Sequence, residues 1–381
     1  MFSRLYVHIP FCLRKCPYCA FVSREPSAGD LEKYGGILLA EMDLAALAYG
    51  AERPLASVYF GGGTPSLLAP HQIDLLLERA ASLFGLEEKA EITLEANPGT
   101  VDQGRLADFR TAGVNRISLG VQSFHDPLLA TLGRIHSATE AREAFQAARA
   151  AGFDNIGIDL IHALPDQTIV QWRREVEQAV QTAPEHISVY GLTLEEGTPF
   201  AERYGNDDTL LPDEDMSATM FEKADDVLTA AGYEHYEIAN YALPGRRSGH
   251  NSGYWRRDGY LGLGTGAHSF LRTGHGVRFG NPDDLDDYAG AVAQGRLPHR
   301  DEQILTRQDA MSEFMFLGLR MADGIEPARF RHEFGVGLEE TFGTEMAKLA
   351  ALGLLETAGD RVCLTRRGML LSNQVFEHFL P

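Results

Sequence analysis

The sequence is poor in cysteine, lacks long apolar runs and has too few basic residues to balance its acidic ones. Four cysteines in 381 residues are too few for a disulfide framework, which indicates reduced thiols. No run of about 18 apolar residues is present to span a bilayer, and the opening MFSRLYVHIPF is too short and too polar for a signal peptide. We therefore expect a cytoplasmic protein without an integral membrane segment.

The charge balance argues against nucleic acid as a partner. The 34 lysines and arginines are outnumbered by 54 aspartates and glutamates, which gives a formal net charge of −20 at pH 7. Binding to a phosphate backbone is driven by counterion release and needs a basic surface, which this chain does not provide. Its length and its 44% hydrophobic content instead predict one large core and an appended domain.

Three of the four cysteines stand together in the run HIPFCLRKCPYCAF. The C-x3-C-x2-C spacing of Cys12, Cys16 and Cys19 lets three thiolates ligate three irons of a cubic 4Fe–4S cluster. The fourth iron is then free to bind a small chelating molecule. A zinc site or a disulfide pair is the alternative, but zinc usually takes a second ligand pair at matching spacing, and none follows. Cys363, in the alternating stretch RVCLT, is expected to be a small core residue.

Strand-like and helix-like segments alternate six times in the first part of the chain. The apolar runs of strand length are LYVHIP, SVYFGGG, EITLEAN, RISLGVQS, NIGIDLIHALP and HISVYGLTL. Continuous apolar strands predict a parallel sheet covered by helices, either an open doubly wound sheet or an incomplete (β/α)6 TIM-type barrel. Polar and glycine residues at several strand ends favour the barrel. The first helix is expected over residues 30 to 49, with Asp30 as its N-cap.

The alternation ends near residue 235, which predicts three parts. Residues 1–235 form the partial barrel, and residues 236–300 form a connecting segment whose stretch 246–281 is too irregular for a simple helix. Residues 301–381 predict a helix, a hairpin turning at residues 358–360 and a final helix. That order resembles a small winged-helix module, which on so acidic a chain we expect to contact protein or ligand.

The motifs resemble one family over nearly the whole chain. A C-x3-C-x2-C run with an aromatic between the last two cysteines resembles the signature of the radical S-adenosylmethionine (SAM) superfamily. YVHIPFC, GGGTP, SLGVQS, IDLIHALP and HNSGYW resemble the oxygen-independent coproporphyrinogen dehydrogenases and their relatives, the heme chaperones of the HemW branch. The resemblance implies that SAM chelates the open iron and contacts Tyr6, Tyr18, Gly62, Gly63, Thr64, Glu95, Gln122, Arg134 and Asp159.

Side-chain chemistry agrees with part of that implied SAM site. Glu95 and Asp159 can accept hydrogen bonds from ribose hydroxyls, and Arg134 can pair with a carboxylate. The glycine run Gly61-Gly62-Gly63 directly follows a strand, where a missing Cβ lets a ligand approach the backbone closely.

Two departures separate this chain from the dehydrogenases it resembles. Those enzymes carry an additional cysteine two residues after the third, where this chain has Phe21. They also have an N-terminal extension that helps to close over porphyrin, whereas only five residues precede Tyr6 here. Both departures argue against porphyrinogen decarboxylation. The alternative function is nevertheless a radical SAM oxidoreductase or transferase acting on a tetrapyrrole such as coproporphyrinogen III.

The run from His250 to Trp255 matches the HNxxYW motif, which the resemblance associates with heme binding. His250 is suited to ligate iron, Tyr254 or Trp255 to pack on the macrocycle, and the following arginines to pair with propionates. In the alternative interpretation, hydrogen bonds of Asn251 and Trp255 simply fold a loop.

His268 and His275 are also available as iron ligands. The overall prediction is a heme chaperone that carries a 4Fe–4S cluster and SAM. Its expected partners are heme and heme-accepting apoproteins. Transient contact with membrane proteins and a homodimer are left open.

Overall fold

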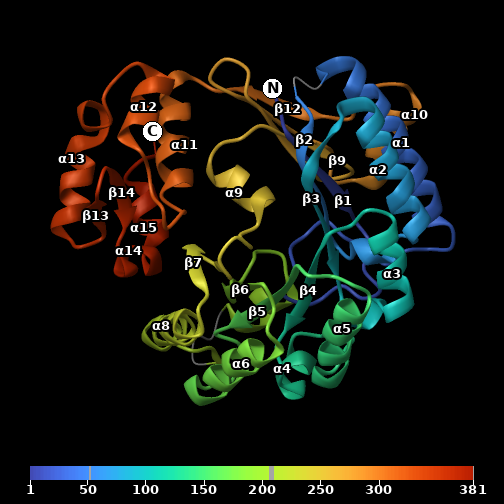
Figure 1. The fold of residues 1–381 in the computed structure, drawn as a ribbon, viewed down its shortest axis with the longest axis horizontal. Coiled ribbons are helices and arrows are strands. Elements are labelled where there is room, and N and C mark those ends of the chain that lie inside the picture. The colour runs from blue at the N-terminus through green and yellow to red at the C-terminus, as the bar shows by residue number, and fades with distance from the viewer. Residues whose placement is uncertain (51–52, 206–209, 381) are drawn as a thin grey trace.

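Six parallel strands form the centre of the fold in the computed structural model, which describes residues 1–50, 53–205 and 210–380 (Figure 1). Each strand pairs in parallel with the next one along the chain. Their bounds are β1 Arg4–Ile9, β2 Leu55–Gly62, β3 Leu86–Ala96, β4 Arg116–Gln122, β5 Ile156–His162 and β6 His186–Gly191. The predicted six-unit α/β arrangement is confirmed.

Helices cover the outer face of these strands (Figure 1). They are α1 Asp30–Tyr49, α2 Pro70–Phe84, α3 Gln103–Thr111, α4 Asp126–Thr131, α5 Ala138–Ala150, α6 Ile169–Thr182, α7 Pro199–Tyr204 and α8 Glu214–Ala230, with short turns η1 Pro65–Leu67 and η2 Pro98–Thr100. The predicted N-cap of α1 is wrong by one residue. Gly29, with a φ of 82°, is the cap, and the Asp30 carboxylate accepts a hydrogen bond from the Ser27 N–H instead.

The segment after β6 extends the sheet at both edges. At one edge, β8 Asn240–Ala242 pairs antiparallel with β6, and β7 Glu234–Glu237 pairs antiparallel with β8. At the other edge, β9 Tyr260–Leu263 pairs in parallel with β1 and leads into β10 His268–Leu271, β11 Val277–Gly280 and β12 Arg300–Ile304. Between the two edges the chain forms α9 Gly249–Trp255, and α10 Leu285–Ala293 follows β11. The stretch expected to be irregular is therefore a helix followed by sheet strands.

A buried carboxylate ties this late segment to the first helix of the barrel. Glu41 on α1 accepts hydrogen bonds from the Gly264 N–H at 2.7 Å, from Asn281 Nδ2 at 2.6 Å and from the Tyr288 hydroxyl at 2.6 Å. Burial raises the pKa of Glu41 to about 7, although these hydrogen bonds favour its ionised form. One side chain thus holds the strands that continue the sheet beyond β1.

The last part of the chain has its own apolar core, built around residues such as Phe314, Phe330, Phe342 and Phe379. Its elements are α11 Arg307–Gly318, α12 Pro327–Phe334, α13 Leu338–Ala351, β13 Leu355–Ala358, β14 Arg361–Leu364, α14 Arg366–Leu370 and α15 Ser372–Glu377. The predicted hairpin is confirmed, and Cys363 is buried in it. The prediction of a single final helix is wrong, because the helix is interrupted at Leu371 and forms two short helices.

The described helices can be compared with the length and hydropathy that a membrane span needs. None of the described ones combines the length and the apolar character that a bilayer span requires.

Candidate functional site

A cavity of about 620 Å³ opens where the parallel strands end, and all three clustered cysteines line it. Their loop follows β1 directly. It is held by hydrogen bonds from the Cys12 N–H to the Arg24 carbonyl at 3.0 Å and from the Cys19 N–H to the Cys16 carbonyl at 3.1 Å. The carboxyl ends of parallel strands are where barrel enzymes place their ligands. The cysteines therefore stand at the position expected for a cofactor site.

The glycine run after β2 is shaped by the cysteine loop. A Cβ on Gly63 would lie 2.6 Å from the Phe11 carbonyl oxygen and 3.0 Å from Cys12 Sγ, so only glycine lets the loop come this close. Thr64 then donates its hydroxyl to Cys12 Sγ at 3.6 Å. Gly63 and Thr64 therefore contact Cys12 directly. The predicted role of the glycines, to let a ligand approach the backbone, is separate from this contact.

The three thiols fit a 4Fe–4S cluster better than they fit zinc or a disulfide. All are free, and within the described ranges no three His, Cys, Asp or Glu side chains converge on a point that would hold one metal ion. A cubic cluster instead needs one thiolate for each of three separate irons. Arg134 Nη1 lies 3.6 Å from Cys16 Sγ, which places a cation beside the cysteine loop.

Most of the residues that the sequence implied for SAM also line this cavity. The structure brings together Tyr18, Gly62, Gly63, Thr64, Glu95, Gln122, Arg134 and Asp159 around the cysteines. Gln122 has a left-handed φ of 66°, a conformation that is uncommon for a non-glycine residue and that ends β4 at the cavity wall. These contacts with SAM stay predictions, but eight of the nine residues line one cavity.

Tyr6 is the exception among the predicted SAM residues. It is not among the residues that line the cavity. Its ring stacks on Tyr59 with 6.2 Å between centroids, and its hydroxyl lies 3.0 Å from His8 Nδ1. Tyr6 thus packs against side chains of β1 and β2.

Two buried carboxyls give the cavity its acceptors. Burial raises the pKa of Glu95 to about 7, and its oxygens accept hydrogen bonds from the Tyr59 hydroxyl at 2.7 Å and the Gly62 N–H at 3.2 Å. Burial also raises the pKa of Asp159, although hydrogen bonds with Ser188 and with Ser118 Oγ, the latter at 3.3 Å, favour its ionised form. A carboxylate has about four lone-pair sites, so each of these carboxyls can accept a further hydrogen bond from a ligand hydroxyl.

The HNSGYW helix α9 lies at the other end of the strands. Ser57, near the amino end of β2, bonds His250 Nδ1 at 2.8 Å, whereas Gly62 at the carboxyl end of the same strand lines the cysteine cavity. The Glu91 carboxylate on β3 accepts from the Gly249 N–H at 2.8 Å and the His250 N–H at 2.9 Å. The structure therefore does not bring α9 and the cysteines to one site.

His250 is a packed interior residue in this structure. Its side chain is 1% exposed, and its second nitrogen, Nε2, lies 2.8 Å from the Tyr254 hydroxyl. Burial holds the pKa of His250 well below its usual value, so the ring is neutral. Both ring nitrogens are already hydrogen-bonded, and iron ligation by His250 stays a prediction that requires these bonds to break.

The alternative interpretation of this motif is corrected in one respect. Hydrogen bonds from Trp255 do not fold the segment, because the indole N–H has no partner among the residues described. Glu91 and His250 hold it instead, and sequence reasoning missed Glu91 because 158 residues separate it from Gly249. Gly253 completes the packing, since a Cβ there would lie 1.7 Å from Arg4 Nε on β1.

One side chain connects the two ends of the barrel. The Tyr59 ring lies 5.0 Å from the His250 ring between centroids, and the Tyr59 hydroxyl donates to Glu95 at the cysteine cavity. The other predicted ligand candidates, His268 and His275, are exposed on the β9 to β11 part of the sheet.

Removing the His250 imidazole should destabilise the heme-free protein. His250→Ala leaves a cavity and two partners, Ser57 and Tyr254, without their hydrogen bonds. We expect a loss of about 2–4 kcal/mol of unfolding free energy, measured by urea denaturation of apoprotein. His275→Ala, at an exposed position, is the matched control and should change stability little. Equal stability of both variants and the wild type would contradict the packing role.

Comparison with known proteins places the chain in a family. Residues 6–179 match the radical SAM superfamily, and residues 305–371 match the HemN C-terminal domain. The heme chaperone HemW of Escherichia coli is 37% identical over 99% of this chain and 97% of its own length, and that of Lactococcus lactis is 36% identical over 98% and 96%.

A solved structure gives the same fold. Coproporphyrinogen III oxidase from Escherichia coli, titled a radical SAM enzyme, superposes with a TM-score of 0.85 over 99% of this chain and 90% of its own, at 24% identity. That likeness concerns the fold alone. Sequence identity over nearly the whole chain is higher to the two chaperones than to this oxidase. The chain belongs to the HemW family of the radical SAM superfamily.

Proposed function

We propose that the protein is a heme chaperone that binds heme and passes it to acceptor apoproteins, and that it carries a 4Fe–4S cluster able to coordinate SAM. The observation that carries this proposal is identity of 35–37% to three HemW heme chaperones over at least 96% of both lengths. The three free thiols around one cavity support the cluster.

The cavity residues supply the chemistry that such cofactors need. Cys12, Cys16 and Cys19 would hold the cluster, which when bound supplies an open iron to the amino and carboxylate groups of SAM. Arg134 lines the cavity, where its guanidinium could pair with a carboxylate. Glu95 and Asp159 would accept from the ribose hydroxyls.

The competing function is a radical SAM enzyme acting on a tetrapyrrole, and one position disfavours it. Phe21 lines the cysteine cavity and is 65% exposed, at the place where the dehydrogenases carry their additional cysteine. Phenylalanine offers neither a thiolate nor a proton to a bound porphyrinogen.

The heme contacts are proposed on α9. His250, Tyr254 and Trp255 are the predicted contact residues, with His250 as the iron ligand. Ligation would require the imidazole to leave Ser57 and Tyr254. A heme absorption spectrum that is identical in the wild type and in His250→Ala would exclude this ligand.

Heme titration and porphyrinogen incubation together test the function. The anaerobically reconstituted protein should bind a single heme per chain. With reductant, SAM and coproporphyrinogen III it should form no protoporphyrinogen. Porphyrinogen turnover by a protein that binds no heme would establish the enzyme instead.

Four further properties of the protein stay predictions. These are a cytoplasmic location, transient contact with membrane proteins, a homodimer, and the division of the chain at residues 235 and 300. Reduced thiols support the first of them, since a cluster of this kind is assembled from unoxidised cysteines.

A further inference from the structure

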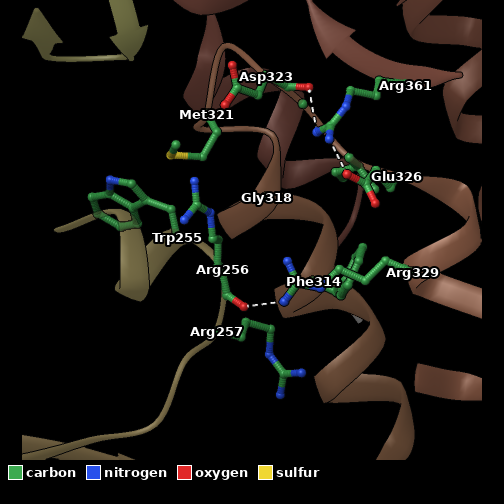
Figure 2. A pocket seen from close by; sticks show the side chains of 12 residues that line it. Trp255, Arg256, Arg257, Phe314, Gly318, Met321, Asp323, Glu326, Arg329 and Arg361 are labelled. Carbon is green, nitrogen blue, oxygen red and sulfur yellow. Dashed lines mark hydrogen bonds and ion pairs between the residues drawn. The ribbon is translucent and has the colours of Figure 1, made fainter. Parts of the chain in front are cut away.

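A second cavity, of about 240 Å³, lies between the end of α9 and the C-terminal elements (Figure 2). Trp255 and Arg256 line it from the barrel side, and Phe314 of α11, Met321 and Arg329 of α12 line it from the other. It is separate from the cysteine cavity, with which it shares no lining residue. Trp255, the last residue of the HNSGYW segment, lines this cavity directly.

Most charges around this cavity are already neutralised. Arg257 pairs with Glu313 at 3.2 Å and with Glu333 at 2.9 Å. Asp323 pairs with Arg247 at 2.6 Å. Arg361 pairs with Glu326, as the dashed lines in Figure 2 show. Among the described residues, both carboxylates that line the cavity, Asp323 and Glu326, are therefore paired with arginines.

Two guanidinium groups have no acidic partner. Arg256 makes no side-chain hydrogen bond or ion pair with any described residue, and it is exposed at the cavity. Among the described residues, the Arg329 guanidinium donates only to the Arg256 carbonyl oxygen, at 2.5 Å, and its cation lies 5.2 Å from the centre of the Phe314 ring. On a chain with a formal charge of −20, two unpaired cations at one cavity favour a ligand with two acidic groups.

The walls favour a ligand with a flat apolar body. Trp255 packs against a small apolar cluster of Tyr236, Ala242 and Met321, and the Arg320 cation lies 4.2 Å from the indole centre, which fixes the ring orientation. Figure 2 shows Trp255 and Met321 on one side of the cavity and Phe314 on another. An aromatic wall beside two guanidinium groups matches a planar ring that carries two carboxylates.

We propose that this cavity binds the propionate edge of heme, with Arg256 and Arg329 each pairing with one propionate and Trp255 contacting the adjacent ring. This inference rests on the proposed heme-chaperone function. The volume is below the roughly 300–1,000 Å³ of sites that enclose a drug-sized ligand, so only an edge of the macrocycle enters. The opposite edge of the macrocycle is then left open for transfer to an acceptor.

The test removes the positive charges of Arg256 and Arg329, which are proposed to pair with the heme propionates. Arg256→Gln with Arg329→Gln should weaken heme binding about tenfold or more, since charge-assisted bonds to carboxylates are lost. Heme dimethyl ester, which has no free propionates, should bind the wild type as weakly as heme binds the double variant. The double variant should bind heme and the ester alike.

Controls separate this inference from the proposed function. Arg174→Gln removes an exposed arginine from α6 and should leave heme affinity unchanged. Cluster absorbance and melting temperature report on the folding of the double variant. Unchanged heme affinity in the double variant, or equal binding of heme and its ester to the wild type, would overturn the inference alone. A wild-type protein that binds no heme overturns the proposed function and the inference together.

Discussion

Replacing Cys12, Cys16 and Cys19 with serine is expected to abolish iron–sulfur reconstitution completely. Each thiolate is needed for a separate iron, and no other described cysteine is within reach, since Cys363 is buried in the β13–β14 hairpin. The broad absorbance of the reconstituted cluster and its iron and sulfide content measure the loss.

Cys363→Ser is the matched control for this experiment. It removes the one remaining thiol of the sequence, and iron and sulfide should stay at wild-type levels. Iron and sulfide that persist in the triple variant, or that disappear with Cys363→Ser, would show that the cluster is held elsewhere.

SAM is expected to bind the reconstituted protein much more tightly than the apoprotein, because the open iron supplies two of its contacts. Asp159→Ala should weaken binding to the reconstituted protein by about tenfold or more, since a buried hydrogen bond to a charged group contributes about 1.5–3 kcal/mol. Equilibrium binding of labelled SAM under anaerobic conditions measures both effects.

Asp154→Ala is the control for the SAM measurement. Asp154 is an exposed carboxylate that precedes β5, whereas Asp159 lies within that strand and lines the cavity. Its removal should leave SAM affinity unchanged. Equal affinity with and without the cluster, or no loss with Asp159→Ala, would contradict this assignment of the cavity.

Local patterns in the sequence predict the parallel core and the cysteine site well. The six strands are continuous apolar runs. The three cysteines lie in one short stretch of sequence, and Gly63 directly follows β2. Position along a parallel sheet then brings strand ends together, so Glu95 and Asp159 could be assigned to one cavity without the structure.

Long-range contacts explain what the sequence could not predict. Helix α9 is seven residues long, and it is fixed by Glu91 and Ser57, which are distant in the chain. Short helices have little intrinsic stability and depend on such tertiary partners. The same reason applies to β9, whose pairing with β1 joins residues more than 250 positions apart.

His250 illustrates the limit of reading a motif by its chemistry. A histidine beside aromatics is suited to ligate iron, but the same residues also suit a packed core in which both nitrogens are hydrogen-bonded. Only burial distinguishes the two, and burial depends on Arg4, Ser57 and Tyr59 from the first two strands.

Heme transfer tests the central claim most directly. Protein loaded with heme is mixed with an excess of apomyoglobin as a heme-free acceptor, and the absorbance spectrum follows the heme. A chaperone should take up a single heme per chain and then give it up, so that the acceptor's spectrum appears while the cluster absorbance stays. A protein that takes up no heme, or that keeps its heme in the presence of excess acceptor, would contradict the account.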